Sequence, residues 1–267
     1  MTASELFHAG KLQEAIAAQV AKVKSAPADQ PARFFLFEML LFAGDIDRAR
    51  KQLDVLKYDD PAHSAAVMQY RMALDAETKR RAVFAGLEEP KGLAVAPDHV
   101  KLRLEAINYM AKGEHAEAQK RLDDANAATP MLKGMLNGKE FEGFGDADER
   151  FGTVIEVFGS GGVYSWVPLE AVVSITLNPP AAPRDVIYRP AQVVMTDGLQ
   201  GDVLLPGLYP NSYEHADESV KVGQATDWVA ADGKVTRGVG GKCFITGNGS
   251  IQLNNILQLI MATDEES

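Results

Sequence analysis

The chain has 267 residues, of which 46% are hydrophobic and 24% are charged. This composition is ordinary for a globular protein, and the length is sufficient for two hydrophobic cores. The net charge of −10 and the isoelectric point near 5.0 argue against nucleic acid and anionic membrane surfaces as partners, because both attract clustered positive charge. The only basic run, Lys79-Arg80-Arg81, is expected to be a solvated helix face.

Three further features concern where the protein works. The single cysteine, Cys243, excludes an intramolecular disulfide and a cysteine-rich metal site. The first residues, Met1 to Leu6, lack the basic and apolar segments of a signal peptide. The most apolar helical stretch, Phe34 to Ala43, is too short to cross a bilayer. We therefore expect a soluble, cytoplasmic protein.

The first half of the chain contains a repeated skeleton. In each copy a glycine is followed by an alanine five residues later and by a proline seventeen residues later. The copies are Gly10, Ala15 and Pro27; Gly44, Ala49 and Pro61; and Gly113, Ala118 and Pro130. The first two copies are 34 residues apart, and the third follows after 69 residues, about twice that period. This period is that of tetratricopeptide (TPR) repeats, in which stacked helix–turn–helix units share a core.

Each residue type of the skeleton has a physical role in a helical hairpin. Glycine tolerates the positive φ that ends the first helix, and the small alanine lets the two helices approach closely. Proline, which lacks an N–H group, stops the second helix. The sequence therefore predicts a TPR-like α-α superhelix. Its helices are expected over residues 3–9, 12–24, 34–43 and 46–58, followed by an eroded unit over 62–97 and a third clear unit over 102–130.

A change of composition follows the helical part. Between Gly134 and Glu149, glycines are interleaved with acidic residues. From Phe151 onward, apolar residues alternate as they do in half-buried strands. We therefore expect a helical-repeat domain over residues 1–136, a linker over residues 137–150 and a β domain over residues 151–267.

The strands of the β domain are predicted from short alternating stretches bounded by turn residues. Asp197-Gly198 is a strong hairpin signal, and the glycine-rich segment 159–162 connects two further strands. The predicted strands cover residues 153–158, 163–167, 172–177, 188–196, 199–205, 225–231, 242–246 and 250–261. Strands this short close most simply into a small antiparallel barrel or sandwich. The expected fold class is therefore a two-domain α + β protein.

No motif indicates catalysis, a cofactor or a metal. Gly240-Gly241-Lys242 resembles the end of a phosphate-binding loop, but Thr236 stands where that motif needs glycine, and Cys243 where it needs serine or threonine. The histidines are scattered without a metal-ligand spacing. Cys243 is expected to be a buried, inert thiol, with Lys242 on the opposite face of the strand. We expect a protein that is not an enzyme.

Large amphipathic side chains are the candidates for partner binding. Aromatic and arginine residues dominate interface energies, and the first helices of TPR-like repeats commonly line a peptide-binding groove. Each of these side chains could equally belong to the core. The candidates are Phe34, Phe37, Tyr70 and Tyr109 in the helical part and Trp166, Tyr188, Arg189 and Trp228 in the β domain.

An ordered set of segments in the second half resembles a known family. The segments are Arg150–Val157, Tyr164–Glu170, Pro179–Ala191, Asp197–Ser212 and Thr226–Trp228. They resemble the ImpE/SciE family, also called TagJ, whose members are accessory proteins of bacterial type VI secretion. The resemblance implies a cytoplasmic, non-enzymatic protein that binds the small, TssB-like subunit of the contractile sheath. It also implies a connection to sheath assembly or to sheath disassembly by the ClpV ATPase.

Three hypotheses about function remain open at the level of sequence. The first is helix-in-groove capture of a short sheath-subunit segment by the repeats. The second is a general TPR peptide-binding chaperone, which would bind unrelated segments. The third is an unrecognised hydrolase in the β domain, which would require a polar pocket with a strongly perturbed carboxylate or histidine. The sequence also leaves the binding surface and the oligomeric state open.

Overall fold

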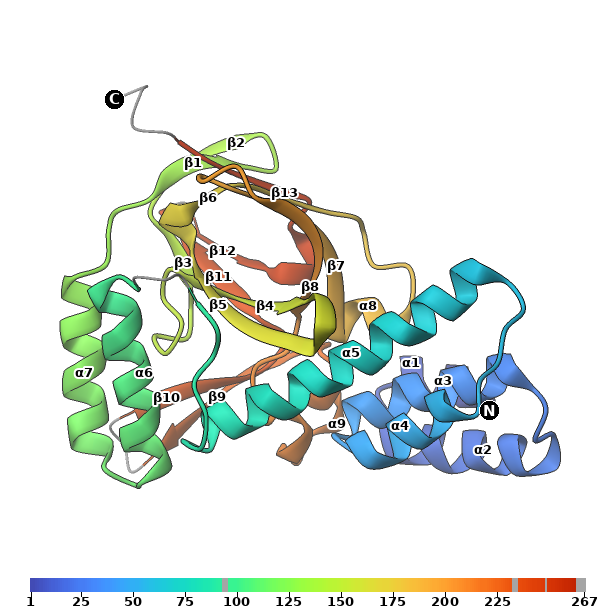
Figure 1. The fold of residues 1–267 in the computed structure, drawn as a ribbon. Helices are drawn as coiled ribbons and strands as arrows, with labels where there is room; N and C mark the ends of the chain where they lie inside the picture. Colours follow the sequence, from blue (N-terminus) through green and yellow to red (C-terminus); the bar gives the residue numbers. More distant parts are fainter. Residues whose placement is uncertain (93–95, 232–234, 248, 263–267) are drawn as a thin grey trace.

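The computed structural model describes residues 1–92, 96–231, 235–247 and 249–262. The first half of the chain is helical and the second half is mostly β-sheet (Figure 1). Among the described residues, no helix combines the length and the apolar character needed to span a lipid bilayer. The helices of the first half are α1 Ala3–His8, α2 Leu12–Ser25, α3 Gln30–Phe42, α4 Ile46–Asp54, α5 Pro61–Phe84, α6 Asp98–Ala111 and α7 His115–Ala127.

The repeated skeleton forms helical hairpins where the sequence predicts them. Gly10, Gly44 and Gly113 follow the first helices of their pairs with φ of 72°, 70° and 77°, a backbone conformation that other residues rarely adopt. The skeleton alanines of α2, α4 and α7 are completely buried; they are Ala15, Ala49 and Ala118. The pairs α1–α2, α3–α4 and α6–α7 are therefore helix–turn–helix units.

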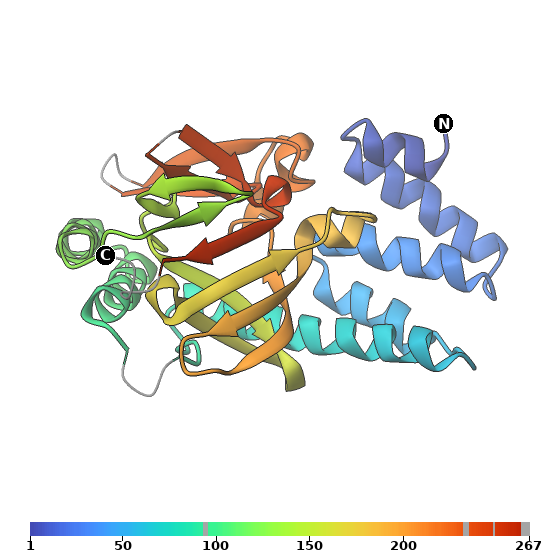
Figure 2. The ribbon, with the colours of Figure 1, turned by 90° about the horizontal axis from the view of Figure 1, so that it is seen from above.

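These hairpins do not stack into one superhelix. Helix α5, with 24 residues, is a single helix where the sequence predicts an eroded helix pair. Helices α1–α4 lie near one end of α5 and the pair α6–α7 lies near the other (Figures 1 and 2). The structure does not confirm the predicted TPR-like superhelix, because α5 packs on strands β4 (Val154–Gly159) and β5 (Val163–Pro168). The sheet thus takes the place of the missing second helix.

The described strands form three antiparallel sheets. The largest has eight strands in the order β2-β1-β13-β6-β7-β8-β4-β5. Besides β4 and β5, its strands are β1 Lys133–Leu136, β2 Lys139–Glu142, β6 Val172–Leu177, β7 Tyr188–Met195, β8 Gln200–Pro206 and β13 Gln258–Met261. A second sheet contains β3 Phe144–Asp146, β11 Cys243–Thr246 and β12 Gly249–Gln252. Strands β9 Thr226–Ala231 and β10 Val235–Gly240 form a two-stranded ribbon, hereafter the ribbon.

The largest sheet curls strongly but is not the predicted closed barrel. Its end strands, β2 and β5, do not pair with each other in the described part of the chain. The free edge of β5 is taken instead by Lys91. The Lys91 amide donates to the carbonyl of Tyr164 at 2.9 Å, and its carbonyl accepts from the amide of Trp166 at 2.8 Å. Lys91 therefore forms an isolated parallel bridge with Ser165 in the middle of this edge.

Several predicted elements of the β half are confirmed and others differ. Strand β10 has no counterpart among the predicted strands. The hairpins β4–β5 and β7–β8 form around the glycine-rich segment 159–162 and around Asp197-Gly198. The predicted strand over residues 250–261 is divided into β12 and β13 by a short turn at Leu253–Asn255. Residues 137–150, expected to be a linker, contain β2 and β3, and β1 before them pairs with β13. The glycine- and acid-rich segment therefore contributes strands to two sheets and is not a linker.

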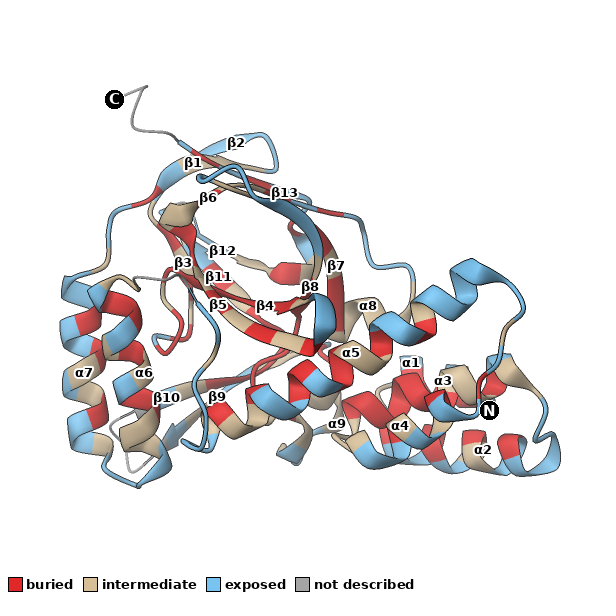
Figure 3. Cartoon of the chain, in the orientation of Figure 1, coloured by how far each residue is buried: buried red, intermediate tan, exposed pale blue. Residues whose placement is uncertain are grey.

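The helices and the sheet share one hydrophobic core (Figure 3). A single cluster of buried residues includes Phe37 and Leu74 from the helices and Phe158 and Tyr188 from the sheet. A second cluster, which includes Ile175, lies on the other face of the curled sheet. Side chains from distant parts of the sequence therefore meet where the helices contact the sheet.

Candidate functional site

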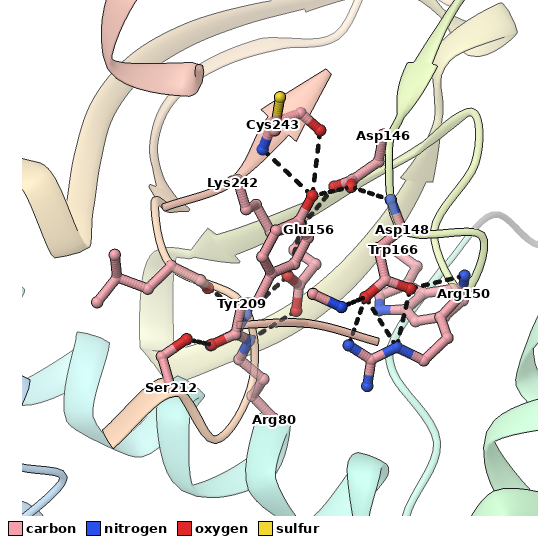
Figure 4. Close-up of polar contacts among 12 residues, drawn as sticks. Arg80, Asp146, Asp148, Arg150, Glu156, Trp166, Tyr209, Ser212, Lys242 and Cys243 are labelled. Atoms are coloured by element: carbon pink, nitrogen blue, oxygen red, sulfur yellow. Dashed lines mark hydrogen bonds and ion pairs between the residues drawn. The ribbon is translucent and has the colours of Figure 1, made fainter. Parts of the chain in front are cut away.

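A buried group of charged side chains joins helix α5 to the sheet (Figure 4). The guanidinium of Arg80 donates from Nε to Oε1 of Glu156 at 2.6 Å and from Nη2 to Oε2 at 2.8 Å. It also donates to the carbonyl of Leu208 at 2.8 Å, while the Tyr164 hydroxyl donates to Glu156 at 2.7 Å. Two parallel charge-assisted bonds fix the position of α5 on β4. The basic run in α5 is thus not simply a solvated face.

Lys242 is the second cation of this buried cluster. Its Nζ lies 2.9 Å from Glu156 and 3.0 Å from Asp146, and 3.6 Å from the centre of the Phe151 ring. The hydroxyl of Tyr209 donates to Asp146 at 2.6 Å. Sequence reasoning missed these partners. The signal was a charged residue inside the apolar run of β4, but Arg80 is 76 positions from Glu156 and Lys242 is 96 positions from Asp146.

The two acidic groups of the cluster have opposite pKa shifts. Burial by itself raises the pKa of Glu156, but Arg80 and Lys242 outweigh burial and hold that pKa at about 2. For Asp146, burial raises the pKa and Lys242 offsets only part of the effect. A carboxylate between two cations is stabilised in its ionised form. Glu156 is therefore the ionised anchor of the cluster at neutral pH.

Asp148 and Arg150 extend the cluster to the ribbon. Arg150 Nε donates to both carboxylate oxygens of Asp148, at 2.9 and 3.0 Å. The same carboxylate accepts the backbone N–H of Gly238 in β10 at 2.7 Å. A side chain at Gly238 would collide with the ring of Tyr209. The ribbon is therefore held directly against the buried cluster.

The geometry of the cluster suits structural support. Arg80, Glu156 and Lys242 are at most 4% exposed. The cavity beside Arg80 and Tyr209 has a volume of about 20 Å³, which holds about one water molecule. The carboxylates with shifted pKa values, those of Glu156 and Asp146, are at most 7% exposed and are therefore shielded from solvent.

The side chains relevant to metal and thiol chemistry are those of the metal-ligand types and that of the single cysteine, Cys243. No group of three or more His, Cys, Asp or Glu side chains among them is placed to hold a metal ion. Cys243 is partly exposed, contrary to the expected full burial, and its partial burial raises the pKa of the thiol. This shift favours the protonated, less nucleophilic form.

Three of the four aromatic residues predicted to line a groove in the repeats are covered; they are Phe34, Phe37 and Tyr70. The ring centres of Phe34 and Phe37 lie 5.9 and 5.6 Å from that of Tyr70. The guanidinium of Arg184, in the short helix α8 (Pro183–Ile187), lies 5.2 Å from the Phe34 ring centre and donates to Glu38 at 2.6 Å. Phe37 and Tyr70 are buried. Helix α8 therefore occupies the side of α3 and α5 that the sequence suggested for a partner.

Three candidates of the β half also belong to the interior. Trp166, Tyr188 and Arg189 are at most 1% exposed. The indole of Trp166 donates to the hydroxyl of Tyr164 at 2.6 Å. Burial lowers the pKa of Arg189, whose guanidinium nitrogens have no hydrogen-bond partner among the described residues. These three side chains are therefore part of the protein interior and not of an exposed surface.

The remaining candidates, Tyr109 and Trp228, lie on the two elements that border an open groove but are not part of its described lining. Tyr109 is half-buried on α6, and Trp228 on β9 is 41% exposed. Between α6 and the ribbon lies a groove of about 350 Å³, hereafter the α6–ribbon groove. Its apolar lining is Phe84, Ile107, Met110, Ala111, Val229 and Ala230, and its polar lining is His115, Arg150, Asn211 and Arg237. Tyr109 and Trp228 are next in sequence to the lining residues Met110 and Val229. The sequence therefore indicated this region of the chain but not the side chains that line the groove.

The described lining of the α6–ribbon groove contains basic residues and no acidic one. The charge of Arg150 is compensated by Asp148. Arg237 is half-buried, and its side chain makes no hydrogen bond or ion pair with the residues that the structure describes. In a protein of net charge −10, this groove is a local positive site.

Comparisons with known proteins agree with the ordered segments of the second half. Residues 138–260 match a family described as ImpE protein. Over 259 residues the chain is 32% identical to the type VI secretion system accessory component TagJ of Pseudomonas aeruginosa, covering 97% of this chain and 90% of TagJ. The crystal structure of protein VPA1032 from Vibrio parahaemolyticus shows the same fold, with a TM-score of 0.88, 22% identity and coverage of 98% of each chain. The chain therefore belongs to the ImpE family, which includes TagJ.

Proposed function

We propose that this protein is a non-enzymatic accessory component of a type VI secretion system that binds the small, TssB-like subunit of the contractile sheath. The observation that carries the proposal is the relation to TagJ, which extends over 97% of the chain. That relation includes both the helices and the sheet. Through the sheath contact the protein takes part in sheath assembly or in its disassembly by the ClpV ATPase.

The buried cluster supports a role in binding over one in catalysis. Its acidic groups are perturbed, as those of a catalytic site can be. They are, however, enclosed, and Arg80 and Lys242 compensate their charge. This arrangement stiffens the contact between α5 and the sheet. A rigid scaffold presents a preformed surface, which reduces the ordering cost of binding a partner.

The proposed contact is the capture of a short helical segment in a groove, and it involves α6 instead of α3. Helix α8 already covers Phe34 and Tyr70, so the groove beside α3 is filled. Helix α6 retains an open apolar groove beside Met110. Burial of a few apolar anchors in such a groove gives dissociation constants on the order of micromolar.

A calorimetric titration tests the proposal. The purified small sheath subunit from the same organism is titrated into the full-length protein, because the helices and sheet share a core and should not be separated. We expect saturable one-to-one binding with a dissociation constant on the order of micromolar. A titration without binding at concentrations well above this range would contradict the proposal.

Two further arms address the alternatives. An unrelated amphipathic peptide of matched length and charge serves as the specificity control. Equal binding of that peptide and the sheath subunit would favour a general chaperone. Addition of the ClpV ATPase to the preformed complex tests the link to disassembly, for which we expect either a ternary complex or competition for the same sheath segment.

A further inference from the structure

The α6–ribbon groove combines an apolar floor with a cation that no described residue compensates. We propose that this groove binds an amphipathic helical segment of the partner that carries an aspartate or glutamate beside its apolar anchor side chains. The inference rests on the proposed function. It adds the binding surface and the chemistry of the segment that the surface selects.

The apolar part of the groove is built from three elements. Phe84 comes from the end of α5, Ile107 and Met110 come from α6, and Val229 comes from β9. Ile107 is buried and forms the floor, whereas the other three are half-buried. A groove of about 350 Å³ is at the small end of binding pockets. The groove is therefore large enough for the anchor side chains of a helix but not for the whole helix. Binding would remove the apolar surface of these side chains and that of the groove from water.

The charge in the groove selects the sign of the partner. The half-buried guanidinium of Arg237 has donors without acceptors among the described residues. A carboxylate matches the planar fork of a guanidinium better than any other side chain of a protein partner. A lysine or arginine at the same place would be repelled. The protein as a whole carries a net charge of −10, so an acidic segment is attracted mainly to this groove. The contact therefore also contributes to the orientation of the bound segment.

Both walls of the groove are held in place by buried contacts. The Asp148 carboxylate accepts the amide of Gly238, next to Arg237, at 2.7 Å. Arg103 of α6 donates to the side chains of Asn126 and Thr129, at 2.9 and 3.0 Å, and so ties α6 to the end of α7. A groove that is preformed in this way loses little conformational entropy when a segment enters it.

Another cavity makes a weaker case. It has a volume of about 880 Å³ and lies beside strands β1, β2 and β13. The one lysine of its described lining, Lys133, pairs with Glu142 at 3.0 Å. No uncompensated charge there indicates the chemistry of a partner.

The test uses four full-length variants, each titrated with the small sheath subunit by calorimetry. Ala111→Trp fills the groove, and Ala116→Trp is its matched control on an exposed position of α7 that is absent from the groove lining. Arg237→Glu reverses the charge in the groove. Its control is Arg48→Glu, at an exposed position of α4. We expect Ala111→Trp and Arg237→Glu to weaken binding about tenfold or more. The controls should stay within about twofold of the wild type.

Salt provides a second readout. Added salt should weaken binding of the wild type and strengthen binding of Arg237→Glu, because screening reduces the attraction of the ion pair in the first and the repulsion of the like charges in the second. Unfolding midpoints equal to that of the wild type verify that the variants fold. Full binding by both groove variants would overturn the inference and leave the sheath contact intact. Failure of the wild type to bind the sheath subunit would overturn the proposed function and this inference together.

Discussion

The hairpins α3–α4 and α6–α7 share one sequence skeleton but have different surroundings. Gly44 and Gly113 occupy the same repeat position with φ of 70° and 77°. A side chain at Gly44 would collide with the ring of Tyr213, whereas nothing lies within 4 Å of the corresponding position at Gly113. The first hairpin is covered by other parts of the chain and the second borders an open groove. The repeat therefore specifies the hairpin, and the packing around it decides whether its face is core or surface.

The composition of the two first helices is consistent with this difference. Helix α3 is apolar nearly all round, with buried residues from Leu36 through Phe42. Such a helix needs cover on most sides. Helix α6 carries exposed charges at Asp98, Lys101 and Glu105. It buries one face and leaves the rest to solvent.

The largest effect is expected from breaking the junction that places both hairpins. Glu156→Gln leaves Arg80 and Lys242 buried without their common anion. We expect a loss of about 3–5 kcal/mol in the free energy of unfolding, measured by urea denaturation. Glu88→Gln, at an exposed position after α5, is the control and should change it by less than about 0.5 kcal/mol. A loss for Glu156→Gln as small as that of the control would show that the junction is dispensable.

Acid should weaken the same junction without a mutation. The pKa of Glu156 is about 2 in the folded protein and 4.5 ordinarily. A lowered folded pKa gives stability that is present above pH 4.5 and is lost as the pH falls towards 2. Glu156 should contribute about 3 kcal/mol to this loss, and the raised pKa of Asp146 offsets part of it. Unfolding free energies between pH 7 and 2 measure this loss, and an equal dependence on pH in Glu156→Gln would contradict the assignment.

A pair of glycine substitutions tests the comparison of the hairpins directly. Gly44→Ala strains the backbone and also collides with Tyr213, so we expect a loss of about 2–4 kcal/mol. Gly113→Ala meets open space and should lose about 1 kcal/mol from backbone strain alone. Thermal unfolding of both variants gives the difference. Equal losses would mean that the cover over α3 adds no constraint.

A smaller effect than that of Gly44→Ala is expected from loosening the cover of α3. Arg184→Ala removes the ion-pair partner of Glu38, whose pKa burial already raises. We expect a loss of about 1–2 kcal/mol at neutral pH, and a smaller one in acid, where Glu38 becomes protonated. Hydrogen exchange should increase in α3 and remain unchanged in α6. The control Arg48→Ala removes only the exposed pair with Asp45 and should cost less than about 1 kcal/mol.

The candidate site was only partly predictable. Aromatic and arginine residues were selected by type, and residue type does not distinguish an interface from a core. Trp166 and Tyr188 are buried because the sheet packs on α5, and this packing is not visible in either strand alone. Arg237 carried no sequence signal. Its place in the groove depends on the pairing of β10 with β9 and on the position of α6 opposite them.

The sequence by itself determined the helical hairpins of the repeat, several β-hairpins and the family. The glycines of the repeat mark helix ends because only glycine adopts positive φ without strain, and Asp197-Gly198 marks its hairpin for a similar reason. The tertiary structure alone decided that the sheet stays open, that α8 covers α3 and that Arg80 pairs with Glu156. These contacts join residues up to 146 positions apart. Local patterns set φ, ψ and the apolar faces, whereas such distant pairs form only when whole elements are placed against one another.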